Sequence, residues 1–154
     1  MSILLLLHSV MRWLVLASLL YSIYRAYQGH QQKLPFTRTD NQVRHWTATI
    51  AHMQLLIGII VYTQSATVKM LATGLANGNG HITEPVFFGI IHITLMLVAI
   101  VIITVGSAMA KRKVLAADKH HTQLIFFSVA LAIIFIAIPW PFSPLAQRPF
   151  IRLS

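Results

Sequence analysis

Residues 4–16 read LLLLHSVMRWLVL, a run of apolar side chains that is broken by the ionisable groups of His8 and Arg12. The apolar run extends on both sides, from about residue 3 to about residue 24. A helix needs roughly 20 mostly apolar residues to cross the hydrocarbon core of a bilayer. This stretch is therefore predicted to span a membrane, and the fold depends on how many such stretches accompany it.

The composition of the whole chain agrees with a membrane protein. Of its 154 residues, 56% are hydrophobic and only 10% are charged, and the mean hydropathy is +0.71. The net charge of +9 arises because the chain has only three acids, Asp40, Glu84 and Asp118. Basic charge in a membrane protein usually lies in cytoplasmic loops, so it does not indicate a nucleic-acid partner. The absence of cysteine excludes disulfides and thiolate metal sites.

Three further stretches are long and apolar enough to span a bilayer. Pro85 lies at the first turn of the third span of the chain, where its missing N–H costs nothing, and Pro139 ends the fourth span. Short connections favour antiparallel neighbours, so we expect one domain: an all-α, integral membrane, up-down antiparallel four-helix bundle that contacts the lipid bilayer. The four spans are predicted at about residues 3–24, 46–64, 86–109 and 122–138.

The loops predict the orientation of the bundle. Basic residues gather between spans one and two, in 25–44, and between spans three and four, in 111–119. The connection 65–83 carries only Lys69. The positive-inside rule places the two basic loops in the cytoplasm, so we expect both termini and the 65–83 loop outside it.

Three of the eight histidines, His8, His52 and His92, fall inside predicted spans. An unpaired polar group in hydrocarbon costs several kcal/mol, so such residues face the bundle interior and often serve a function. The alternative is that each imidazole only hydrogen-bonds across a helix pair and helps the helices to pack.

The depths of His8 and His92 in their predicted spans indicate that these two histidines form a pair. With a rise of 1.5 Å per residue, His8 lies roughly 7–8 Å and His92 roughly 8–10 Å from the outer ends of their spans. Spans one and three are diagonal partners in an up-down bundle, so the two imidazoles face each other at one level. A bare metal usually needs three or four ligands, whereas a haem brings four nitrogens and needs only two. This spacing predicts a haem b whose iron is bound by His8 and His92.

Arg12 lies four residues after His8 and therefore on the same helix face. No span contains an acid to neutralise it, and a guanidinium is well shaped to pair with a haem propionate. A second haem between His52 and His121 is left open, although His121 lies about 10 Å shallower. Another alternative is that His52 and Gln54 serve a proton or quinone path.

Five motifs resemble a family of small four-span proteins from Bacteroidetes-type bacteria that is described as cytochrome b-like. The resemblance covers about residues 4–142, and the motifs are LHSVMRWLVL, FTRTDNQ, AHMQLLIGIIVY, FFGIIHITLM and IPWPF. It implies haem b, electron transfer and a place in the bacterial inner (cytoplasmic) membrane. The positions that match the family are His8, Ser9, Arg12, Trp13, His52, Gln54 and His92, together with Lys119-His120-His121 and Pro139-Trp140-Pro141-Phe142. Gly89-Ile90-Ile91 departs from the family, which has an acidic or polar residue before this histidine, so proton uptake is not expected there.

These features favour an electron-transfer subunit over an enzyme that acts alone. No nucleophile–base pair, phosphate loop or metalloprotease motif is present. The expected partners are other membrane redox subunits or further copies of this chain, and a quinone is a further candidate ligand. Two alternatives remain: a cofactor-free accessory or assembly subunit, and a small proton-coupled transporter. The transporter is disfavoured because the spans of this chain lack the Gly/Pro breaks that are typical of transporter sites.

Overall fold

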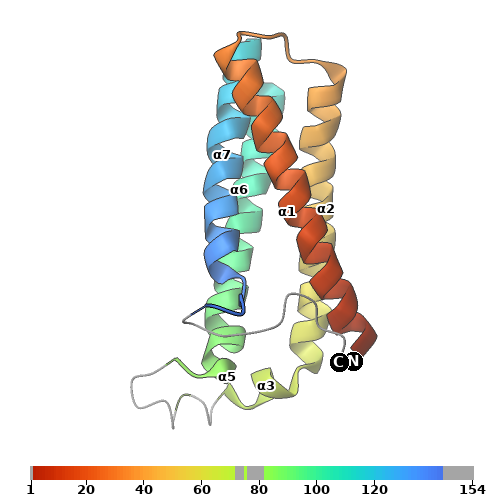
Figure 1. Ribbon diagram of the computed structural model, residues 1–154, viewed down its shortest axis with the longest axis vertical. Helices are drawn as coiled ribbons and strands as arrows, with labels where there is room; N and C mark the ends of the chain where they lie inside the picture. Colours follow the sequence, from red (N-terminus) through yellow and green to blue (C-terminus); the bar gives the residue numbers. More distant parts are fainter. Residues whose placement is uncertain (1, 72–74, 76–81, 144–154) are drawn as a thin grey trace.

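The computed structural model describes residues 2–71, 75 and 82–143. In this part of the chain the regular structure is helical throughout, without a strand. The long helices run up and down beside one another, each antiparallel to the next (Figure 1). The long helices are α1 (Ser2–Gln31), α2 (Arg38–Gln64), α6 (His92–Arg112) and α7 (Ala116–Ala137). The short elements are α3 (Ala66–Lys69), α5 (Glu84–Val86) and the π-turn η1 (Phe87–Ile91).

Each long helix has two neighbours. Helix α1 packs against α2 and α7, and α6 packs against α7 and α2, so α1 and α6 lie diagonally opposite. The predicted all-α, antiparallel four-helix arrangement is confirmed. This diagonal relation matters because His8 comes from α1 and His92 from α6.

All four helical segments are long and apolar enough to cross a bilayer. Large apolar side chains point away from the bundle on every helix, for example Leu56, Val101 and Ile136, which are 62%, 59% and 59% exposed. Water would penalise this apolar surface and lipid would not. The chain is therefore a multi-pass membrane protein.

The helices are longer than the predicted spans at the end with the basic loops. Helix α1 continues to Gln31 and α2 already begins at Arg38. Thr37 and Asp40 form a capping box: the Thr37 hydroxyl accepts from the Asp40 backbone N–H at 3.2 Å, and an Asp40 oxygen accepts from the Thr37 backbone N–H at 2.8 Å. Hydropathy locates only the apolar part of a helix, so these polar turns lay outside the predicted spans.

Small residues allow α6 and α7 to approach closely. A side chain at Gly106 would collide with Phe126 of α7, and Ala99, Ala110 and Ala130 are buried. Lipid supplies no hydrophobic drive for helices to associate, so such close van der Waals packing holds membrane bundles together.

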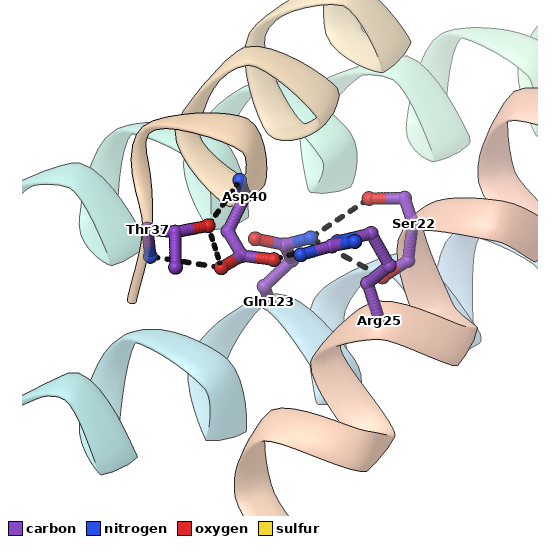
Figure 2. A network of polar contacts seen from close by, with 5 residues as sticks. All are labelled: Ser22, Arg25, Thr37, Asp40 and Gln123. Atoms are coloured by element: carbon purple, nitrogen blue, oxygen red, sulfur yellow. Dashed lines mark hydrogen bonds and ion pairs between the residues drawn. The ribbon is translucent and has the colours of Figure 1, made fainter. Parts of the chain in front are cut away.

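A polar network joins α1, α2 and α7 near the end with the basic loops, as Figure 2 shows. Arg25 donates to Asp40 at 2.7 Å, and the same carboxylate caps α2 through Thr37. Gln123 of α7 donates to the hydroxyl of Ser22 at 2.8 Å. These contacts connect three helices at this end of the bundle.

Candidate functional site

A cavity lies inside the opposite half of the bundle, between all four long helices. Its polar lining includes His8 and Arg12 from α1, Gln54 from α2 and His92 from α6. About 180 Å³ is accessible to the centre of a water molecule. A single water needs about 10–15 Å³ on that scale, so this space is large enough for an organic ligand. The rest of the lining is mostly apolar, with Met96 among the side chains that form it.

His8 and His92 face each other across this cavity. Their ring centroids lie 6.5 Å apart, and the ring planes are inclined by 72°. Two imidazoles that bind one metal from opposite sides have centroids about 6 Å apart, since each metal–nitrogen bond is about 2 Å. The structure therefore brings together the two residues that depth matching paired, at a separation that suits a shared metal. That they bind a metal stays a prediction.

His92 is held from behind by α7. Its Nδ1 lies 2.8 Å from the backbone oxygen of Ala137. Because a carbonyl only accepts, the proton of the neutral ring is assigned to Nδ1, and Nε2 keeps its lone pair. Metal-binding histidines commonly donate their second nitrogen to a carbonyl in this way.

The backbone just before His92 forms the π-turn η1. The His92 N–H bonds to the carbonyl of Phe87, five residues earlier, and Tyr62 of α2 donates to the carbonyl of Gly89 at 3.1 Å. Single π-turns in α-helices often occur at functional sites. Sequence reasoning missed both Tyr62 and the π-turn, because neither leaves a periodic signal.

His8 lacks the support that His92 has. Its Nδ1 is buried, and no hydrogen-bond partner lies within the described residues. Gln54 donates from Nε2 to the His8 carbonyl at 3.0 Å, while its Oε1 is also buried without a partner in that part of the chain. A buried polar group left unbonded costs about 1–3 kcal/mol. On the side of the cavity that faces α2, these two polar atoms therefore lack hydrogen bonds within the described residues.

Gly58 lines the cavity, whereas Gly89 packs against Leu71. A Cβ at Gly58 would lie 3.3 Å from Cε1 of His8, so this glycine lets α2 approach the imidazole. A Cβ at Gly89 would instead meet Leu71 at 3.0 Å. Gly58 borders the histidine pair, whereas Gly89 provides a close packing contact.

Arg12 lines the same cavity, and its guanidinium lies over the ring of Trp13, 5.6 Å from the centroid. Trp13 in turn contacts Trp140, with 5.9 Å between ring centroids. No Asp or Glu is among the described residues that line the cavity. The sequence placed Arg12 near His8 but did not reveal its contact with Trp13.

His52 and His121 have different neighbours. His52 lies 2.6 Å from the Ala48 carbonyl through Nδ1 and 3.0 Å from the Thr104 hydroxyl through Nε2. The ring of His121 lies 4.9 Å from that of His30. The structure therefore does not bring His52 and His121 together, and the contacts of His52 are those of a residue that links α2 to α6. A second haem at this pair finds no support in these contacts.

His120 has a role that the sequence did not indicate. It is only 1% exposed, and both ring nitrogens are buried without a hydrogen-bond partner within the described residues. A side chain at Gly29 would collide with the imidazole, and the Phe36 ring lies 4.9 Å away. His120 thus lies between α1 and Phe36, and it lines a pocket together with Arg25 and Asp40. His81 and most of the 71–81 stretch lie outside the described residues.

The described residues contain no group of three or more His, Asp or Glu side chains that could hold a bare metal ion. No family model, curated protein or solved structure matches the chain.

Proposed function

We propose that this chain binds one haem b through His8 and His92 and serves as an electron-transfer subunit in a membrane redox complex. The observation that carries the proposal is the 6.5 Å separation of the two rings inside a membrane-embedded cavity. A haem requires only two protein ligands because its four pyrrole nitrogens complete the coordination. When bound, it supplies reversible one-electron chemistry.

The remaining residues of the cavity suit this ligand. Ala137 orients His92 so that Nε2 is free to bind. Arg12 lines the cavity on the same helix as His8, and it would pair with a propionate in a charge-assisted contact. Met96 and Ile134 contribute apolar walls that would exclude water from the haem ring. Each of these roles belongs to a side chain that already lines the cavity.

The distribution of charge supports a membrane placement for this function. We place the basic ends of the helices, with Arg25 and Arg38 at one end of the bundle, in the cytoplasm. The histidine pair then lies near the outer side of the membrane, and both termini lie outside the cytoplasm. The resemblance to the cytochrome b-like family adds the bacterial inner membrane as the location. Partner redox subunits, further copies of the chain or a membrane quinol complete the proposal.

A visible spectrum tests the proposal. Purified protein reduced with dithionite is expected to show the sharp bands of a six-coordinate haem b, with one haem per chain. His8→Ala and His92→Ala should each remove or shift these bands. His45→Ala is the matched control, because His45 is exposed at the other end of α2. A folded but colourless wild-type protein would overturn the proposal and favour the cofactor-free accessory role.

The same preparation addresses the second site. His52→Ala and His121→Ala should leave both the spectrum and the haem stoichiometry unchanged, because neither residue lines the cavity. Two haems per chain in the wild type, reduced to one in either variant, would restore the second-haem alternative.

A further inference from the structure

The two histidines of the cavity differ in what holds their Nδ1 atoms. For His92 the partner is the Ala137 carbonyl, at 2.8 Å. For His8 no partner is present among the described residues. We propose that Gln54 is a positioning residue for His8: a rotation of its side chain brings Oε1 to the Nδ1 proton, and this contact leaves the Nε2 lone pair for the ligand. The purpose of this contact rests on the proposed function, but the tautomer it predicts does not.

The first support is that the Nδ1 edge of His8 faces α2. A Cβ built at Gly58 would lie 3.3 Å from Cε1 and 3.7 Å from Nδ1 of His8. Gln54 lies four residues before Gly58, so the two share one face of α2. The buried nitrogen is therefore directed toward the helix face that carries Gln54.

The second support is chemical complementarity. Gln54 already contacts His8, since its Nε2 donates to the His8 carbonyl at 3.0 Å. Its Oε1 can only accept a hydrogen bond, and it has no partner in the described structure. The Nδ1 of a neutral imidazole can donate. The two unpartnered atoms are thus an acceptor and a potential donor on residues that already touch.

The arrangement would give the two histidines matching supports from different sources. A backbone carbonyl of α7 serves His92, and a side-chain amide of α2 serves His8. A second partner of this kind fixes the tautomer of a metal-binding histidine and raises its basicity. Only the support of His8 can be altered by a single side-chain substitution, which makes the inference testable.

The decisive experiment uses haem-free protein in detergent, with ¹⁵N-labelled histidine, at a pH where both imidazoles are neutral. The nitrogen chemical shifts distinguish a protonated from an unprotonated ring nitrogen. In the wild type we expect the proton on Nδ1 of both His8 and His92. In Gln54→Leu the His8 proton should move to Nε2, wholly or in part, whereas His92 should not change. Gln54→Glu should keep the proton of His8 on Nδ1.

Two results would overturn the inference: a His8 proton on Nε2 in the wild type, or an unchanged His8 tautomer in Gln54→Leu. Tyr62→Phe is the control, because it removes a hydroxyl from the same cavity and should leave His8 as in the wild type. His92 in each sample reports whether the cavity is still folded.

Haem-loaded protein gives a second readout. Gln54→Glu should lower the reduction potential and Gln54→Leu should raise it, because a stronger acceptor makes the imidazole more basic and favours the oxidised form. Shifts in the same direction in both variants would count against a positioning role. If no haem binds to the wild type, the proposed function fails, while the tautomer experiment still decides the role of Gln54.

Discussion

The two ends of the bundle treat their cations differently. At the end with the basic loops, Arg44 is only 5% exposed, and it donates to the Ser107 carbonyl at 3.0 Å, to the Ser107 hydroxyl and to Asn41 at 2.8 Å. Arg25 donates to Asp40 at 2.7 Å. At the other end, Arg12 lines the cavity of the histidine pair, and no Asp or Glu is among the described residues that line it. The first two cations join helices, whereas the cavity beside Arg12 suits an acidic ligand.

The buried histidines repeat this contrast. His120 and His8 both have ring nitrogens without a partner among the described residues. Each ring also borders a cavity, which His120 lines together with Gly29 and Asp40, and which His8 lines together with His92. Unsatisfied imidazole atoms beside a cavity are therefore not in themselves the mark of a ligand site. The second imidazole across the cavity, His92 at 6.5 Å, is what distinguishes the surroundings of His8 from those of His120.

The largest expected effect comes from filling the two glycine positions. Gly29→Ala should destabilise the protein by about 1–3 kcal/mol, because the new Cβ collides with the buried ring of His120. Gly58→Ala should cost much less, since its Cβ lies 3.3 Å from His8 and the cavity leaves that ring room to move. Thermal unfolding in detergent measures both. Equal losses of stability would contradict the difference in steric fit at the two glycines.

Removing a polar partner at each end should give the next largest difference. Asp40→Ala removes the capping box of α2 and is expected to cost about 0.5–2 kcal/mol. Its ion pair with Arg25 adds little, because Arg25 is 30% exposed and solvent screens the charge. Arg12→Leu should weaken haem retention, because the cavity loses its guanidinium. Titration with haem and thermal unfolding, run on both variants, separate the two outcomes; unchanged haem retention in a folded Arg12→Leu would contradict the ligand role.

Tyr62→Phe should cost about 0.5–1.5 kcal/mol, the usual worth of one hydrogen bond, because the Gly89 carbonyl loses its donor. Hydrogen exchange should increase at the amides of the π-turn and stay unchanged in α7. Unaltered exchange in 87–91 would show that the π-turn does not depend on this contact.

His52→Ala should have the smallest effect. Its contact with Thr104 joins α2 to α6, and such hydrogen bonds in membranes contribute about 0.6 kcal/mol on average. We expect a slightly lower unfolding temperature and no change in ligand binding. Thr104→Val should give the same small change, and the double variant should lose no more than either alone.

The sequence predicted depth well and rotation poorly. Four apolar stretches predicted the number of long helices and their antiparallel order, and a fixed rise per residue paired His8 with His92. Rotation about a helix axis is different, because packing decides which face points inward. His52 lies at a suitable depth, yet its side chain is exposed and bonded to Thr104. The same limit hid the burial of His120 and the contact between Gln54 and His8.

The π-turn before His92 has a consequence for changes in chain length. A π-turn contains one residue more than an α-turn, so deleting one residue from 87–91 could restore a regular helix. His92 would keep its place, because its ring is fixed to Ala137 of α7 from the far side. The segment before it would rotate by about 100°. The segment that enters the third span can therefore lose one residue while His8 and His92 keep facing each other.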